Sequence, residues 1–114
     1  MLPSVMLELR YYLAGDGASP FEEWFASLAA PAAAKVAVAL ARLEQGNLSN
    51  AKAVGEGVLE CRIDWGPGYR VYFGRDGDVL AILLTGGTKQ RQRRDIEAAK
   101  ANWADYKRRR PRLK

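Results

Sequence analysis

Two arginines and a tyrosine are spaced so that they can share one face of a sheet, where the arginines can bind a phosphate group. Arg62 lies in an apolar-alternating segment, and Arg70 and Tyr72 lie in the next one. Alternate side chains of a strand point to the same face, so an antiparallel hairpin would make Arg62 and Arg70 near cross-strand neighbours. Two like charges at that spacing are unfavourable without an anion between them, and guanidinium groups pair bidentately with phosphate. The spacing therefore favours an anion-binding sheet face.

Structural explanations of the same residues stay open. Glu60 and Asp64 alternate onto the face of Arg62, so both arginines can simply form ion pairs on a solvated sheet. Tyr72 can stack on a base or act as a weak acid, but an exposed tyrosine is also an ordinary strand residue.

The segment Val58–Leu84 must position these side chains, and it reads as an antiparallel meander of three runs. Gly66-Pro67-Gly68 suits the first turn, because proline presets φ and the following glycine accepts a positive φ. Asp76-Gly77 is a two-residue hairpin signal. The last run, Val79–Leu84, is almost wholly apolar, which predicts a central strand buried on both faces. We expect one face of the meander to pack on a core and the other to carry the arginines and Tyr72.

The remaining elements complete a small α+β domain. Ser19 is a predicted N-cap, and an apolar stripe that includes Trp24 faces the core. The predicted order is β-α-α-β-β-β-α, a mainly antiparallel sheet with a helical hairpin and a C-terminal helix. Its parts are a strand at Val5–Leu13, helices starting at Pro20 and Pro31, a loop at Leu48–Gly57, the meander closed by Gly86-Gly87, and a helix from about Lys89 to Tyr106.

The positive charge is concentrated at one end of the chain. Residues 1–88 carry 7 basic and 10 acidic side chains, whereas residues 89–114 carry 11 basic and 3 acidic ones. We expect residues 1–106 to form a single domain and residues 107–114 (KRRRPRLK) to be a disordered basic tail. The charge predicts a polyanion or an acidic protein as partner, although a solvated tail also explains it.

Several classes of protein are disfavoured by composition. The sequence has no histidine and no cluster with metal-ligand spacing, so we expect no metal site, no cofactor and no histidine-based triad. The single Cys61 is expected to be a small core residue in a reducing compartment. The N-terminal apolar residues are interrupted by Glu8 and Arg10, so no signal peptide or membrane span is expected. These features predict a cytoplasmic protein without membrane contact.

The segments GEGVLECRIDWGPGYRVYFGRDG, LLTGGTK and QRRDIEAAK, in this element order, resemble the RelE/ParE toxin superfamily. The resemblance is closer to its HigB-like, phage-derived branch of addiction module killer proteins, and it covers roughly residues 6–106. It implies the toxin of a type II toxin–antitoxin pair, a metal-independent endoribonuclease that cleaves mRNA on the ribosome. The implied partners are the mRNA, the ribosome and an adjacently encoded antitoxin of the helix-turn-helix type.

The resemblance also implies roles for individual residues. RNA cleavage without a metal requires a deprotonated 2′-hydroxyl, a stabilised phosphorane and a protonated 5′-oxygen, and clustered lysine, arginine and tyrosine can supply these functions. Asp95 matches the family motif but also suits the first turn of a helix. The arginines near the start of that helix oppose its dipole, so helix stability does not explain them. The implied catalytic residues are Arg62, Arg70, Lys89 and Tyr72, and the implied RNA-binding residues are Lys52, Arg91, Gln92, Arg93 and Arg94.

The sequence departs from the family at two points. Some HigB-like proteins use histidines, which are absent here, and some RelE-like proteins use a tyrosine near the start of the last helix, where this chain has Arg93-Arg94-Asp95. Two alternatives therefore stay open. One is a ParE-like inhibitor of DNA gyrase without nuclease activity, and the other is a degenerate, non-enzymatic RNA-binding protein.

Overall fold

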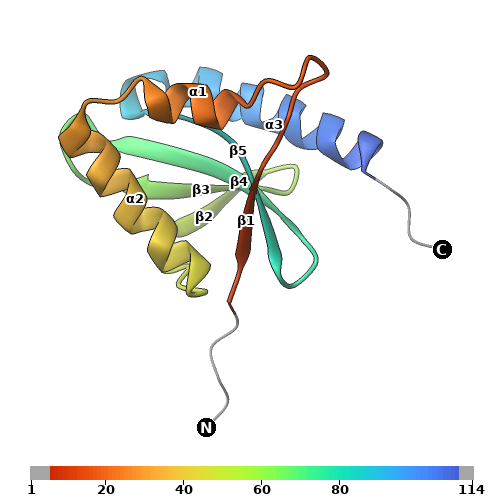
Figure 1. The fold of residues 1–114 in the computed structure, drawn as a ribbon, viewed down its shortest axis with the longest axis horizontal. Helices are drawn as coiled ribbons and strands as arrows, with labels where there is room; N and C mark the ends of the chain where they lie inside the picture. Colours follow the sequence, from red (N-terminus) through yellow and green to blue (C-terminus); the bar gives the residue numbers. More distant parts are fainter. Residues whose placement is uncertain (1–5, 111–114) are drawn as a thin grey trace, which may run out of the picture.

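A computed structural model describes residues 6–110, in which five strands form one sheet with helices on both faces (Figure 1). The fold is α+β, as predicted, with one strand more than the sequence indicated. The elements are β1 (Glu8–Tyr11), α1 (Pro20–Ala26), α2 (Ala30–Glu44), β2 (Ala51–Gly55), β3 (Val58–Ile63), β4 (Tyr69–Asp76), β5 (Leu80–Thr88), the 3₁₀ turn η1 (Lys89–Arg91) and α3 (Gln92–Arg109).

The strand order is β1-β5-β4-β3-β2, with β1 parallel to β5 and the other pairs antiparallel. β5 therefore has a neighbour on each side, and its residues Ala81–Leu84 are buried. This confirms the prediction of a central strand buried on both faces. One meander turn is as predicted: Gly68 takes a φ of 80° after Pro67, a conformation that glycine adopts without strain. The other turn is longer than the predicted two-residue hairpin, because Asp76 pairs with Leu80 and leaves Gly77, Asp78 and Val79 as the loop.

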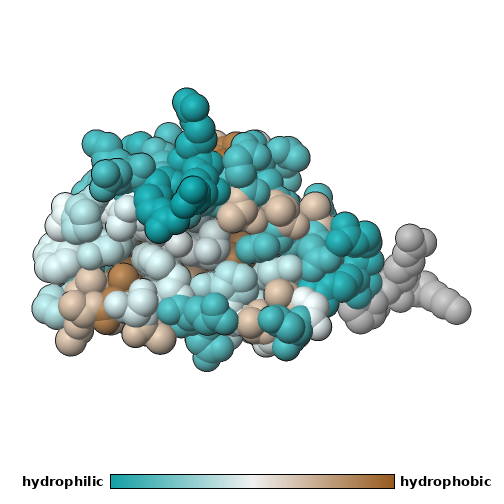
Figure 2. All heavy atoms as spheres, turned by 90° about the horizontal axis from the view of Figure 1, so that it is seen from above, coloured by the Kyte–Doolittle hydropathy of each residue, from teal (hydrophilic) through white to brown (hydrophobic). Residues whose placement is uncertain are grey.

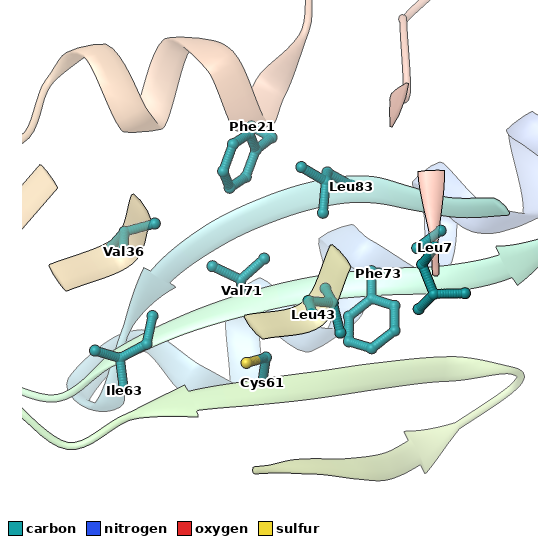
Figure 3. Packing of buried hydrophobic residues seen from close by; sticks show 10 residues of the cluster. Leu7, Phe21, Val36, Leu43, Cys61, Ile63, Val71, Phe73 and Leu83 are labelled. Atoms are coloured by element: carbon teal, nitrogen blue, oxygen red, sulfur yellow. The ribbon is translucent and has the colours of Figure 1, made fainter. Parts of the chain in front are cut away.

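α1 and α2 cover one face of the sheet and enclose the main core (Figure 3). The Ser19 hydroxyl caps α1 by accepting a hydrogen bond of 3.0 Å from the Glu22 amide. Phe21 points from α1 toward Val71 and Leu83 of the sheet. Trp24 lies directly over Gly86, where any side chain would meet the indole ring. Cys61 belongs to this core, as predicted, and burial raises the pKa of its thiol.

The opposite face is more covered than the sequence predicted. α3 lies across it and encloses a second core in which Trp103 packs on Gly74. The remaining buried residues of this core are Tyr12, Val58, Tyr72, Ile82, Leu84 and Ala99. This face carries Arg62, Arg70 and Tyr72, as expected, but the apolar stripe of α3 packs on it and covers Tyr72.

Three predicted boundaries need correction. The expected loop at 48–57 contains β2, a short edge strand whose small side chains give no clear alternation. β5 runs through Gly86-Gly87 as far as Thr88, because β4 pairs with it along this length. α3 continues three residues past Tyr106, so residues 107–109 are helical rather than disordered. Val5, expected in the first strand, and residues 111–114 of the expected tail lie outside the described residues.

The extension of α3 is explained by ion pairs that the sequence does not reveal. Asp105 accepts a hydrogen bond of 2.9 Å from Arg109 Nε, and Tyr12 donates one of 2.7 Å to the same carboxylate. Arg110 Nη1 lies 2.9 Å from Asp76 Oδ1. These contacts tie the end of α3 to β1 and to the β4–β5 turn.

Candidate functional site

Two rows of residues cross the sheet on the face covered by α3. Residues directly opposite one another in paired strands share a face. Along each strand, the second row is two residues away from the first. It lies nearer the end of the sheet where the chain leaves β5 and enters α3. The first row is Lys52–Glu60–Tyr72–Thr85, and the second is Arg62–Arg70–Gly87. The prediction that Arg62 and Arg70 are cross-strand neighbours is confirmed.

Glu60 is the carboxylate around which the two arginines are arranged. Its side chain is 0% exposed, and Oε1 lies 3.6 Å from Arg62 Nε and 3.8 Å from Arg70 Nε. Oε2 accepts a hydrogen bond of 2.7 Å from Gln92 Nε2 of α3. Both ion-pair distances exceed hydrogen-bond length, so Glu60 compensates the guanidinium charges without saturating their donors. Ion pairing within the sheet is thus a real part of the arrangement.

The two arginines differ sharply in their access to solvent. The Arg62 side chain is 45% exposed, whereas that of Arg70 is 3% exposed. Arg70 Nη1 donates a 3.3 Å hydrogen bond to the Tyr69 carbonyl, and its Nε has no hydrogen-bond partner among the described residues. Arg62 can therefore touch an incoming phosphate directly, while Arg70 contributes its charge from beneath the surface.

Tyr72 does not lie where the sequence placed it. Its side chain is fully buried under α3, so the expectation of an exposed strand tyrosine is wrong, and in this arrangement its ring cannot stack on a base. Burial raises the pKa of the Tyr72 hydroxyl, and the nearby carboxylates of Glu60 and Asp95 raise it further. Tyr72 therefore stays neutral at physiological pH and forms part of the floor beneath Glu60.

Lys89 lies at the exposed edge of this face, next to the β3–β4 turn. Its amide donates a 2.7 Å hydrogen bond to the Gly68 carbonyl. A side chain at Gly68 would lie 3.4 Å from Lys89 Cβ and 3.6 Å from Arg70 Nη1, which places the lysine stem and the Arg70 guanidinium on either side of this glycine. Lys89 thus lies close to Arg70, at the edge of the face that carries the arginine pair.

Lys52 and Gln92 approach Glu60 from different directions. Lys52 stands opposite Glu60 on the edge strand β2 and is exposed. Gln92 is half-buried and binds Glu60 rather than facing solvent. Its contact thus favours a structural role in holding α3 on the sheet, whereas Lys52 is available to a ligand.

Asp95 is a carboxyl whose placement the sequence did not reveal. It sits over Gly87, and a side chain at Gly87 would overlap the Asp95 carboxyl. Burial raises the pKa of Asp95, and the charges of Arg91 and Arg94 oppose that effect. Asp95 Oδ2 is buried without a hydrogen-bond partner among the described residues. Gly87 is the one feature of the sequence that could have indicated this contact, because a glycine inside a strand often marks a close approach by another group.

Arg91, Arg93 and Arg94 are exposed together around η1 and the first turn of α3. Figure 2, which views the molecule from above relative to Figure 1, shows a largely hydrophilic surface with hydrophobic residues in separate patches. With Arg62, Lys52 and Lys89, these arginines give the molecule a set of exposed cations next to the buried Glu60–Arg70 pair. This arrangement suits a polyanion.

Two kinds of feature are absent from residues 6–110. Within residues 6–110, no three histidine, cysteine, aspartate or glutamate side chains are grouped so that they could hold a metal ion. Over the same residues, no helix combines the length and the apolar character needed to cross a membrane.

Comparison with known proteins identifies the family. Residues 23–105 match the family described as Phage derived protein Gp49-like (DUF891). The chain belongs to this family. The Gp49-like proteins are a HigB-like family of RelE/ParE toxins, so the resemblance seen in the sequence is confirmed. An uncharacterized protein of Haemophilus influenzae is 44% identical over 81 residues, which cover 70% of this Gp49-like chain and 82% of the relative.

Proposed function

We propose that this Gp49-like protein is the toxin of a type II toxin–antitoxin pair and that it cleaves mRNA on the ribosome. Family membership supports the toxin assignment. The observation that carries the nuclease assignment is the pair Arg62–Arg70, opposed across two strands and held around the buried Glu60, with Lys89 at its edge.

The cationic pair meets the main electrostatic demand of RNA cleavage. Attack of the 2′-oxygen on the adjacent phosphorus concentrates negative charge on the non-bridging oxygens, and preorganised donors aimed at that charge lower the barrier. In this proposal Arg62 and Lys89, both exposed, contact the phosphate. Arg70 strengthens the positive potential from within the sheet, where water screens its charge less.

Proton transfer is assigned to Asp95 and Lys89. A carboxyl whose pKa is raised toward neutrality is a better general base at physiological pH, and burial acts on Asp95 in that direction. Asp95 covers Gly87, in the same cross-strand row as the arginine pair. We assign removal of the 2′-hydroxyl proton to Asp95 and protonation of the departing 5′-oxygen to the Lys89 ammonium group.

The proposed protein partner is an antitoxin, of the helix-turn-helix type and encoded next to the toxin. Its expected contact is the exposed cationic surface, because covering Arg62 and Lys89 would block RNA. Co-expression with the adjacent open reading frame should then relieve growth arrest. Harmless expression of the toxin alone, with no binding by the neighbouring product, would contradict the toxin assignment.

The nuclease step is tested with purified protein and programmed ribosomes. Single-turnover reactions should cleave the mRNA, and replacing the 2′-hydroxyl by hydrogen at the cleaved nucleotide should abolish cleavage. A parallel assay of DNA supercoiling addresses the gyrase alternative. Loss of supercoiling with intact mRNA would refute the nuclease proposal in favour of a gyrase inhibitor.

A further inference from the structure

A pocket of about 330 Å³ opens between α2 and the end of β3. Lys35 and Arg42 line it from α2, and Arg62, Asp64 and Trp65 line it from β3 and the turn that follows. The volume lies at the lower end of the range for small-ligand sites. Arg62 therefore borders this pocket at the end of β3, while its guanidinium lies beside Glu60 on the sheet face covered by α3.

Trp65 gives the pocket an exposed aromatic surface. Its side chain is 37% exposed, although large aromatic side chains are normally well buried. The indole stacks on Tyr69 with ring centroids 6.2 Å apart and an interplanar angle of 23°, and Tyr69 in turn contacts Trp24. The ring is therefore supported by packed aromatics while part of its surface stays open to a ligand.

The charge of the pocket favours an anion. It is lined by three cationic residues and one carboxylate, Asp64. Neither Lys35 nor Arg42 has an ion pair within 4 Å among residues 6–110, and the one partner of Arg62 is Glu60 at 3.6 Å. These cations are thus available for phosphate groups, while the Asn47 and Asn50 amides at the pocket wall suit the polar edge of a base.

We propose that this pocket binds one nucleotide of single-stranded RNA, with the base stacked on Trp65 and its flanking phosphates held by Lys35 and Arg42. A stacking ring beside a cationic groove is the combination by which proteins bind unpaired RNA. Trp65 also begins the β3–β4 turn. In this turn the Gly68 carbonyl accepts a hydrogen bond from the Lys89 amide. This turn thus links the pocket to the edge of the cationic surface at Lys89, and the inference rests on the proposed function in taking one RNA strand to bind both.

Asp64 restricts which base the pocket accepts. A carboxylate accepts hydrogen bonds and donates none when ionised. Adenine, cytosine and guanine carry an exocyclic amino group that can donate to it, whereas the N3–H donor of uracil is flanked by two carbonyl oxygens that the carboxylate would repel. The pocket should therefore bind uracil least well.

The test measures binding without cleavage. The probe is a short single-stranded RNA with 2′-O-methyl groups at every position, titrated at low salt and followed by tryptophan fluorescence. Trp103 is 4% exposed and Trp24 is half-buried, so Trp65 is the tryptophan that a base can reach from solvent. We expect oligomers of adenine, cytosine or guanine to quench the fluorescence more than oligouridine does.

Variants assign the signal to this pocket. Trp65→Phe should remove the quenching and keep most of the affinity, and Trp65→Ala should weaken binding about 5- to 100-fold. Tyr11→Ala is the matched control, because Tyr11 is 47% exposed and stacks on Phe21 away from the pocket. Lys35→Ala and Arg42→Ala should each reduce the salt dependence of binding. The slope of log K against the logarithm of the salt concentration should become shallower by about 0.7.

Two results would overturn the inference. The first is RNA binding that leaves Trp65 fluorescence unchanged and is equally strong in Trp65→Ala. The second is absence of RNA binding at low salt together with quenching of Trp65 by an acidic peptide, which would make the pocket a protein-docking site. Failure of the nuclease proposal looks different, since the ribosome assay would then show intact mRNA while the methylated RNA still binds at Trp65.

Discussion

Glu60 and Arg70 form an ion pair that solvent barely reaches. The Glu60 carboxylate and the Arg70 guanidinium lie 3.8 Å apart, with side chains 0% and 3% exposed. Burying two charges is costly unless each compensates the other, and removing one partner leaves an unpaired buried charge. The pair therefore makes the cationic surface above it sensitive to substitutions that lie beneath it.

We expect each half of this pair to depend on the other. Glu60→Leu should lower the free energy of unfolding by about 3–5 kcal/mol, because it leaves the buried Arg70 charge unpaired. Arg70→Met should lower it less, because Arg62 still pairs with Glu60. The double variant should lose clearly less than the two single losses added together. Denaturant unfolding of the four proteins measures this coupling.

The control is the exposed pair Glu56–Lys100, with a distance of 3.3 Å and a Glu56 side chain that is 72% exposed. Glu56→Gln should change the free energy of unfolding by less than about 1 kcal/mol. Additive losses in the Glu60/Arg70 cycle would show that the two charges do not interact across the strands.

Much of the fold could be predicted from the sequence, because turn residues and apolar periodicity are local signals. The turn residues Pro67-Gly68 and Asp76-Gly77 indicated the turns of the meander, and Ser19 indicated the start of α1. β2 escaped detection because the apolar positions in Ala51-Lys52-Ala53 are alanines, which are weak strand formers, and the strand forms only against the free edge of β3. Residues 107–109 read as a charged tail because the long-range contacts at this end of α3, from Tyr12 to Asp105 and from Arg110 to Asp76, are set by the fold.

The site was predicted less completely than the fold. Strand alternation correctly placed Arg62 opposite Arg70, but it cannot tell which residues a distant helix covers. α3 buries Tyr72 and Arg70 and leaves Arg62 exposed, and that difference depends on where the helix crosses the sheet. The central position of Glu60 follows from the same tertiary contact, since Gln92 reaches it from α3.

Gly74 should be intolerant of even a methyl group. A Cβ atom at this position would lie 2.6 Å from Trp103 Cδ2, inside the van der Waals contact distance. Gly74→Ala should therefore lower the free energy of unfolding by about 1–3 kcal/mol through overpacking. Gly15→Ala is the control, because no atom lies within 4 Å of a Cβ there. Equal stability of the two variants in urea would mean that Trp103 is not held on Gly74.

Acid should loosen the end of α3 through Asp105. Hydrogen bonds from Arg109 and Tyr12 lower the pKa of this carboxyl to about 2. Because the folded pKa lies below the unfolded value of about 3.9, the contribution is complete above about pH 4 and is lost as the pH falls through 2. The urea midpoint should fall over this range, and the fall should be smaller in Asp105→Asn. If Asp105→Asn had the same dependence of the urea midpoint on pH as the unmodified protein, Asp105 would be excluded as the titrating group.

The last prediction separates chemistry from RNA binding on the cationic surface. Arg62 faces the proposed phosphate and is exposed, so Arg62→Ala should keep the fold and remove a donor that acts most strongly as charge develops in the transition state. Loss of one such donor reduces the rate by on the order of 10²–10³. Arg94, exposed on the first turn of α3, should instead contribute to binding, so Arg94→Ala should raise the concentration needed for half-maximal rate in a salt-dependent way.

Single-turnover cleavage of mRNA on programmed ribosomes, at saturating and at limiting enzyme, distinguishes these two effects. Arg108→Ala is the control, because Arg108 is 71% exposed at the far end of α3 and pairs with Asp105. A saturating rate for Arg62→Ala equal to that of the control would refute the active site on this sheet face. The Arg62–Arg70 pair would then be an ion-pair network that organises the sheet around Glu60, and the exposed cations would serve binding alone.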